Sequence, residues 1–170
     1  MDYFAGSKYI GVSLLISNNP EAGALDRAVQ RNVPIMILNK KDFFANDAII
    51  KFLLSEKTDL IVLAGFLWLI PEKLIEAFPG KIINLHPALL PLHGGKGMFG
   101  MNVHRAVLEA REKESGITVH YVNKNFDEGK IIFREKCALS PEETPQSLAS
   151  RIHLLEHEHY PKIIEQVLSA

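Results

Sequence analysis

The sequence predicts an α/β protein with a Rossmann-like, mostly parallel sheet flanked by helices and an antiparallel hairpin near its C-terminal part. Short apolar runs rich in β-branched residues alternate with segments of helical spacing. The run at 59–64 is almost entirely apolar, which is typical of a parallel strand covered on both faces. Alternating runs at 117–123 and 131–139 flank a polar turn, which predicts the hairpin.

Strands and helices alternate along the chain. We expect strands at 9–17, 34–38, 59–64, 82–86, 117–123 and 131–139. We expect helices at 22–30, 46–57, 71–78, 102–111 and from 144 onward. Asn46 is the expected N-cap of the second helix, and Pro71 suits the first turn of the third. Leu25 and Val29 should share the apolar face of the first helix, and Pro161 should kink or interrupt the last one.

Composition and charge narrow the class of protein. At 170 residues the chain is long enough for one domain with a sizeable core. Its net charge of −1, with mixed signs, argues against nucleic acid or an anionic membrane as a partner. The single cysteine, Cys137, suits a reducing compartment, and the first residues do not resemble a signal peptide. These observations predict a cytoplasmic protein acting on small molecules; they do not address its oligomeric state.

The segment 81–91, KIINLHPALLP, carries the clearest candidate site. Asn84 and His86 should point to the same side of a strand, because side chains alternate along it. Pro87 should end this strand, since proline has no N–H to donate to a ladder. An amide and an imidazole are therefore expected together at the carboxyl end of a strand, where ligands bind in open α/β sheets.

Asn84 and His86 are suited to holding an oxyanion during acyl transfer, because an amide and an imidazolium both donate hydrogen bonds. A carboxylate such as Asp127, if it lay within reach, would favour the charged imidazole and raise its pKa. Spacing alone does not show that it is within reach. A histidine beside a proline at a strand end is also often a purely structural, hydrogen-bonded residue.

Three further patterns have simpler interpretations. Residues 95–100 match G-x-G-x-x-G, but a proline-rich loop precedes them, which favours a flexible loop opening a helix over a dinucleotide site. His153, Glu156 and His157 match an inverted zinc-peptidase motif, yet a third ligand is lacking, so no metal is expected. The apolar loop 65–70 reads as core, although a ring-binding pocket would have the same composition.

Taken together and in order, these motifs resemble the phosphoribosylglycinamide formyltransferases of the folate-dependent formyltransferase superfamily. The resemblance rests on 64–66 (AGF), 83–91 (INLHPALLP), 116–122 (GITVHYV) and 126–129 (FDEG), and extends from about Val12 to Leu168. It implies transfer of a formyl group from 10-formyltetrahydrofolate, as cosubstrate, to the amine of 5-phosphoribosylglycinamide in purine biosynthesis, without a metal.

The resemblance also implies roles for individual residues. Asn84 and His86 match the residues that stabilise the tetrahedral oxyanion. Asp127 matches the aspartate that keeps this histidine protonated and helps to take the proton from the attacking amine. His120 matches a supporting histidine, and Glu156 a glutamate that binds the ribose hydroxyls. The folate-binding positions implied are Leu67, Trp68, Leu69, Ile70, Asn84, Asn123, Lys124, Asn125, Phe126 and Asp127.

The chain departs from the family pattern in three places. Trp68 stands where an arginine is expected, and the 94–100 loop is longer than usual. Residues 12–19 align with the family's second strand, so its first strand and its glycine-rich phosphate-binding loop are missing. We therefore expect residues 1–170 to be a single formyltransferase domain, N-terminally truncated relative to the family, with Met1 an internal methionine and weak binding of the ribonucleotide.

Two alternatives to this function stay open. The chain could be another folate-dependent formyltransferase or hydrolase, although the extra domains usual in those enzymes are absent from the sequence. It could also be a folate-binding remnant impaired in nucleotide binding.

Overall fold

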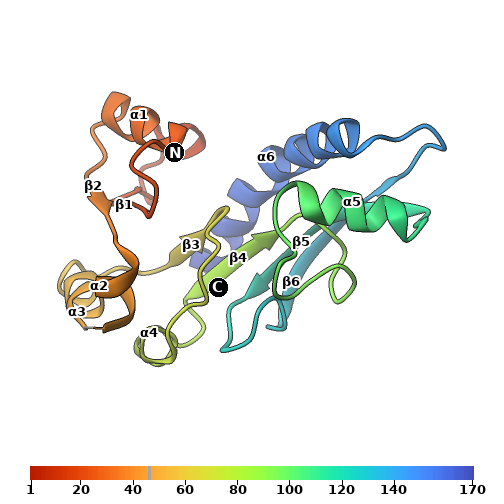
Figure 1. Cartoon of the computed structure of the whole chain (residues 1–170). Helices are drawn as coiled ribbons and strands as arrows, with labels where there is room; N and C mark the ends of the chain where they lie inside the picture. The colour runs from red at the N-terminus through yellow and green to blue at the C-terminus, as the bar shows by residue number, and fades with distance from the viewer. Residues whose placement is uncertain (46) are drawn as a thin grey trace. The chain divides into compact units, whose positions relative to one another are not determined.

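A computed structural model of the chain describes residues 1–45 and 47–170. The chain divides into two compact parts, Met1–Glu56 and Lys57–Ala170 (Figure 1). We describe each part by itself. The single domain expected from the chain length stays a prediction.

The N-terminal part contains one small parallel sheet with helices. Its elements are the 3-10 helix η1 (Asp2–Phe4), β1 (Leu15–Ser17), α1 (Gly23–Gln30), β2 (Ile35–Ile37), α2 (Lys40–Ala45) and α3 (Ala48–Ser55). β1 and β2 pair in parallel, with Leu15 opposite Ile35, and α1 makes the crossover between them. The predicted strand–helix–strand alternation is confirmed here.

Two details of this part differ from the sequence prediction. β1 covers only the last three residues of the expected 9–17 strand, because its partner β2 is itself only three residues long. Tyr9, at the start of the expected strand, is 95% exposed. Val29 is also exposed, and it is Ala28 on the neighbouring face of α1 that is fully buried. The helical spacing of Leu25 and Val29 therefore identified the helix but not its buried face.

The helix α2 was not expected from the sequence. The side-chain oxygen of Asn39 accepts a hydrogen bond of 2.9 Å from the amide of Asp42, the arrangement of a helix N-cap. The Asn-x-x-Asp spacing was the signal that could have predicted it. The next helix, α3, begins after Asp47. The expected cap, Asn46, lies outside the described residues.

The C-terminal part is built on a four-stranded sheet in the order β3-β4-β5-β6. Its elements are β3 (Ile61–Leu63), α4 (Glu72–Ala77), β4 (Ile82–His86), α5 (Met101–Glu109), β5 (Glu114–Tyr121), β6 (Ile131–Ala138) and α6 (Pro145–Ser169). β3 and β4 are parallel, whereas β5 runs antiparallel to both β4 and β6. The α/β class with parallel pairs and a C-terminal hairpin is thus confirmed.

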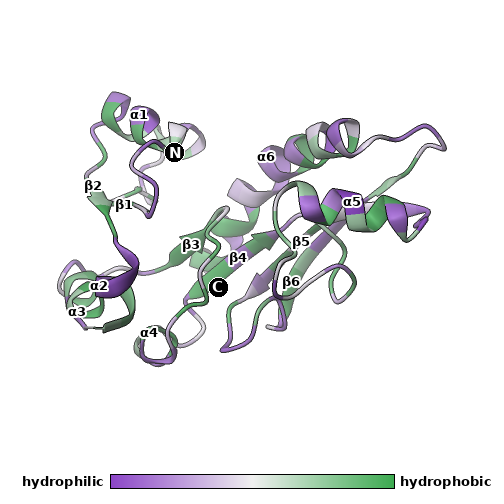
Figure 2. Cartoon of the chain, viewed as in Figure 1, coloured by the Kyte–Doolittle hydropathy of each residue, from purple (hydrophilic) through white to green (hydrophobic). Residues whose placement is uncertain are grey.

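The helices α5 and α6 pack against each other and against this sheet (Figure 1). The apolar cluster between them contains Val103 and Val107 from α5, Leu148 and Ile152 from α6, and Ile117 from β5. Each is at most 1% exposed, so each contributes about 1.5–3 kcal/mol to folding by burial. In Figure 2, β3 and β4 are mainly hydrophobic while α5 shows both colours, as expected of a half-buried helix.

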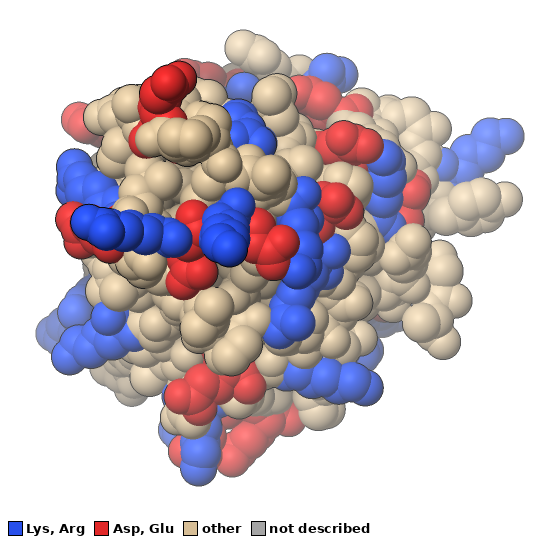
Figure 3. Space-filling view, turned by 90° about the vertical axis from the view of Figure 1, so that its right-hand side faces the viewer, with Lys and Arg blue, Asp and Glu red and all other residues tan. Residues whose placement is uncertain are grey.

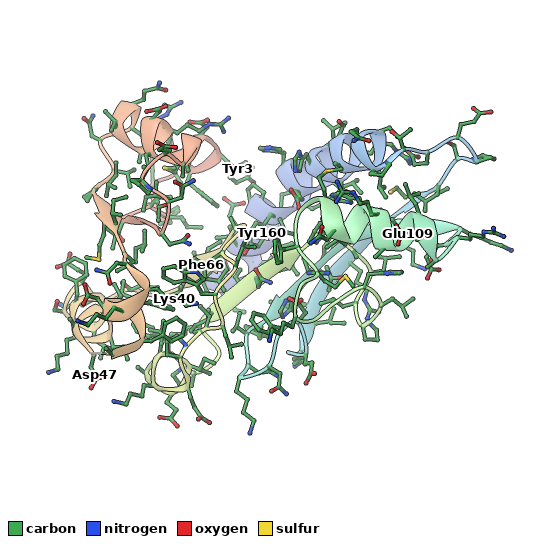
Figure 4. All side chains as sticks on the ribbon, in the orientation of Figure 1. Tyr3, Lys40, Asp47, Phe66, Glu109 and Tyr160 are labelled. Atoms are coloured by element: carbon green, nitrogen blue, oxygen red, sulfur yellow. The ribbon has the colours of Figure 1, made fainter. Side chains whose placement is uncertain are left out.

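The long helix α6 is fixed at its start and near its end. The Thr144 side chain accepts from the Ser147 amide at 3.1 Å, forming a capping box with the reciprocal bond from the Thr144 amide to the Ser147 hydroxyl. The helix continues through Pro161, so the expected interruption there is wrong. Tyr160, labelled in Figure 4, donates its hydroxyl to the carbonyl of Leu63 at 2.9 Å, which ties the helix to the end of β3.

Charged side chains of both signs are interspersed on the face drawn in Figure 3. This distribution agrees with the balanced net charge of the sequence. Within residues 1–45 and 47–170, no helix is long and apolar enough to cross a membrane.

Candidate active site

The strand β4 ends at the candidate site. In the sheet, Asn84 of β4 lies opposite Leu63 of β3 on one side and opposite His120 of β5 on the other. His86, two residues later, is the last residue of the strand and is 3% exposed. The pairing of β4 with β5 therefore brings a second histidine next to the predicted Asn84 and His86.

Asp127, in the turn between β5 and β6, reaches all three of these side chains. One of its carboxylate oxygens lies 3.5 Å from His86 Nδ1, and the other lies 3.4 Å from Asn84 Nδ2 and 3.6 Å from His120 Nε2. Its backbone has a φ of 57°, a left-handed conformation that few residues other than glycine, asparagine and aspartate adopt. Asp127 therefore lies within reach of His86, which the sequence spacing alone did not show.

His86, His120 and Asp127 are each held by a short hydrogen bond to the backbone. His86 Nε2 lies 2.8 Å from the carbonyl oxygen of His93, and His120 Nδ1 lies 2.8 Å from that of Tyr121. The amide of Gly95 donates to Asp127 Oδ2 at 2.9 Å. By comparison, the contacts among Asn84, His86, His120 and Asp127 measure 3.2–3.6 Å. The anchors are thus short and the inward contacts long, which leaves polar capacity for a ligand.

The backbone anchors also fix the positions of the ring protons. A carbonyl oxygen only accepts, so His86 must carry a proton on Nε2 and His120 must carry one on Nδ1. The nitrogen of His86 that gains or loses a proton is therefore Nδ1, which faces Asp127. The unprotonated nitrogen of neutral His120 is Nε2, which accepts from Asn84 Nδ2 at 3.2 Å. The second amide hydrogen of Asn84 points to Asp127.

Burial and charge compete at His86 and Asp127. Burial lowers the pKa of His86, and the charge of Asp127 and the His93 carbonyl raise it without overcoming burial. The sequence prediction of a raised pKa is therefore wrong for the free chain, although Asp127 acts in the expected direction. Burial raises the pKa of Asp127, but His120, His86 and the Gly95 amide together outweigh it, and the net pKa lies below its ordinary value. Asp127 is therefore a carboxylate at neutral pH.

Thr118 holds the loop that follows β4, and it was missed by the sequence prediction. Its hydroxyl donates to the carbonyl of Ala88 at 2.7 Å and accepts from the amide of Leu90 at 3.0 Å. Arg134 of β6 donates to the carbonyl of Leu90. Only the alternating pattern of the 117–123 run hinted that Thr118 faces the same side of the sheet as His120.

The glycine-rich segment 95–100 lies in the loop between β4 and α5 and has no strand immediately before it. Gly95, Gly97 and Gly100 all have φ between 52° and 95°, so the segment turns where a side chain would be strained. The interpretation as a loop opening a helix is confirmed. The contact of Gly95 with Asp127 was not predicted, and nothing in the local spacing indicated it.

The expected folate-binding segments lie in two loops of this part of the chain. Leu67–Ile70 follow β3, whose last residue Leu63 is next to Asn84 in the sheet. Leu67 and Leu69 are 50% and 38% exposed, whereas Ile70 is buried. Trp68 is half-buried and its ring contacts Phe66 edge-to-face, with centroids 5.6 Å apart.

The second segment, 123–126, lies in the β5–β6 turn that carries Asp127. The side chain of Asn123 accepts from the amide of Asn125 at 3.0 Å, and Asn125 donates to Glu128 at 2.6 Å. Lys124 is exposed and Phe126 is half-buried. These bonds within the turn give it a defined shape next to the Asp127 carboxylate.

Glu156 lies on α6, one turn before Tyr160. Burial raises its pKa, partly offset by His153, whose Nε2 is 4.0 Å away. The imidazole of His159, further along the same helix, contacts the ring of Phe133. Across the described part of the chain, no group of three or more histidine, cysteine, aspartate or glutamate side chains could hold a metal ion.

Comparison with known proteins defines the class. Residues 5–164 match the formyl transferase family model, so the chain belongs to the formyl transferase family. The resemblance noted in the sequence is confirmed by phosphoribosylglycinamide formyltransferases in both sequence and structure. The chloroplastic enzyme of Arabidopsis thaliana is 37% identical over 164 residues, covering 94% of this chain and 56% of its own length. The enzyme of Bacillus subtilis is 36% identical over 160 residues, covering 92% of this chain and 80% of its own length.

Solved structures agree with this assignment. The crystal structure of phosphoribosylglycinamide formyltransferase from Anaplasma phagocytophilum has a TM-score of 0.87 at 34% identity, covering 99% of this chain and 78% of that one. The similar structure from Bacillus halodurans has a TM-score of 0.86 at 29% identity. The chain spans about half the length of the plant relatives, 56% and 53% for those from Arabidopsis thaliana and Vigna unguiculata.

Proposed function

We propose that the chain catalyses transfer of the formyl group of 10-formyltetrahydrofolate to the amine of 5-phosphoribosylglycinamide. The observation that carries this proposal is the cluster at the end of β4. An amide, an imidazole and a carboxylate converge there: the imidazole and the carboxylate are anchored to the backbone, and the carboxylate makes only long contacts of 3.4 and 3.5 Å with the amide and the imidazole. The names of the relatives, phosphoribosylglycinamide formyltransferases, support the choice of substrates.

In this proposal Asn84 and His86 hold the oxygen of the formyl group. As the amine nitrogen attacks the formyl carbon, the π electrons of the carbonyl move to its oxygen. Asn84 Nδ2 and His86 Nδ1 exchange their long contacts with Asp127 for bonds to the developing oxyanion. The negative charge that develops on this oxygen beside Nδ1 favours the imidazolium form of His86 and opposes the effect of burial. No metal is required, because these two donors supply the polarisation.

Asp127 handles the proton in the same proposal. It is a carboxylate in the free chain, so it can accept a proton from the amine nitrogen once the new C–N bond has formed. The carbonyl then re-forms, the bond from the formyl carbon to N10 breaks, and the proton passes to N10 of the leaving tetrahydrofolate. His120 is the supporting residue, because its Nε2 accepts from Asn84 Nδ2 and so orients that amide.

We further propose that the loops beside the cluster bind the two substrates. The exposed leucines of Leu67–Ile70, with backbone groups of the same loop, suit an aromatic ring system, and 123–127 flank it from the β5–β6 turn. Glu156 is the proposed partner of the ribose hydroxyls, since a carboxylate accepts from both. A cytoplasmic location also stays a proposal, because the plant relatives are described as chloroplastic.

The direct test is absorbance-monitored formyl transfer from a 10-formyltetrahydrofolate analogue to 5-phosphoribosylglycinamide. Asn84→Ala should lower kcat by about 10²–10³, the usual effect of removing an oxyanion donor. Loss of the formyl group without added amine is measured in parallel as a control for hydrolysis. Turnover that is unchanged in Asn84→Ala, or that needs no amine, would refute the proposed reaction.

A further inference from the structure

His93 and Glu112 form a half-buried contact next to the candidate site, and no role has been assigned above to either side chain. The backbone carbonyl of His93 is the acceptor that holds His86 Nε2 at 2.8 Å. The imidazole of the same residue contacts a carboxylate, with Nε2 3.1 Å from Glu112 Oε1. The two side chains are 15% and 33% exposed. A single residue thus connects His86 to a carboxylate outside the site.

The position of the His93 carbonyl decides which nitrogen of His86 faces the site. With this acceptor in place, Nε2 carries a proton in both the neutral and the charged ring, and Nδ1 is the nitrogen that titrates. Without it, the other neutral tautomer of His86, with its only proton on Nδ1, becomes accessible, and in that tautomer Nε2 rather than Nδ1 is the nitrogen that titrates. The carbonyl therefore has to be held in place for the site to work as proposed.

The loop that carries this carbonyl has little intrinsic rigidity. Four of the seven residues from Gly94 to Gly100 are glycine, and His93 itself has a left-handed φ of 54°. Two contacts fasten the start of the loop: the His93–Glu112 pair, and the bond from the Gly95 amide to Asp127. Glu112 is itself fixed, because its amide donates to the carbonyl of Val107 in α5 at 3.3 Å.

We propose that His93 and Glu112 are positioning residues: their side-chain contact fixes the His93 carbonyl, which in turn sets the tautomer and orientation of His86. The kinetic consequence rests on the proposed function, whereas the tautomer of His86 does not. The titratable groups that act on His86 are Asp127, His120 and His93, together with His104 of α5. Glu112 acts on His86 through the loop, by way of His93.

The test measures the ring nitrogens of His86 directly by long-range ¹H–¹⁵N NMR correlation, with the signals assigned by a His86→Gln variant. In the parent chain we expect the tautomer protonated on Nε2. In Glu112→Ala and in His93→Asn we expect a mixture of tautomers. Asparagine tolerates the left-handed φ of position 93, so this variant removes the side-chain contact without adding backbone strain. Glu112→Gln keeps an acceptor oxygen and should retain the parental tautomer.

A matched control is Glu114→Gln, which breaks the exposed ion pair of Glu114 with Lys136 and should leave His86 unchanged. In turnover assays, Glu112→Ala should lower kcat by about 10-fold with little change in KM, because misplacement of a catalytic group acts on the chemical step. An unchanged His86 tautomer in Glu112→Ala would overturn the positioning role. A parent chain that shows the expected tautomers without turnover would instead overturn the proposed reaction.

Discussion

Replacing Thr118 with valine should destabilise the C-terminal part of the chain, because the hydroxyl of Thr118 satisfies two backbone groups. Valine has nearly the same shape but neither donates to the carbonyl of Ala88 nor accepts from the amide of Leu90. Ala88 is fully buried and Leu90 is 3% exposed, so water does not readily replace the hydroxyl. A buried polar group left unsatisfied costs about 1–3 kcal/mol. With a small gain from the added methyl group, we expect the free energy of unfolding to fall by about 2–4 kcal/mol.

Urea unfolding followed by tryptophan fluorescence is the appropriate assay. The chain has a single tryptophan, Trp68, which lies in the same compact part as Thr118. The matched control is Thr118→Ser, which keeps the hydroxyl and loses only a methyl group, at a cost of about 1 kcal/mol. If Thr118→Val proved as stable as Thr118→Ser, the two hydrogen bonds would not be what holds the loop after β4.

Two further predictions concern stability. Burial is the main reason why the pKa values of His86 and His104 lie below 6.5, so the unfolded chain takes up protons first as the pH falls. The contribution of these two histidines to the free energy of unfolding should be fully present above about pH 6.5 and should decline below it. The decline should be shallower in His104→Gln. Urea midpoints that do not change down to about pH 5 would contradict this prediction. Gly116→Ala would push a methyl group against the Glu135 carbonyl and within 2.8 Å of Leu89, and should cost about 3 kcal/mol in the same assay. Gly23→Ala, with nothing within 4 Å, is its control.

The sequence predicted most reliably what depends on a local pattern. The alternation along 82–86 placed Asn84 and His86 on one side of a strand, and the structure brings both to Asp127. The polar turn between two alternating runs predicted the hairpin that carries Asp127. These features follow from strand geometry and turn chemistry, which are properties of neighbouring residues.

What the sequence could not predict depends on contacts between distant residues. The lowered pKa of His86 results from burial by the fold, which no spacing around position 86 reveals. The contacts of His86 with the His93 carbonyl and of Gly95 with Asp127 depend on the path of a glycine-rich loop. Pro161 was expected to kink or interrupt α6, but the helix continues through it. The neighbouring Tyr160 and Ile164 are buried, and such packing outweighs the loss of one hydrogen bond.

The difference in length between the anchoring bonds and the inward contacts has a thermodynamic consequence. A molecule that enters the cluster does not need to break the short bonds of 2.8–2.9 Å to the backbone; it replaces contacts of 3.2–3.6 Å that are weak to begin with. Little enthalpy is therefore lost when these side chains reorient, and most of the enthalpy of the new short hydrogen bonds is released as heat. Binding at this cluster should show a favourable enthalpy in calorimetry, as expected when preformed polar groups rather than apolar surface provide the recognition.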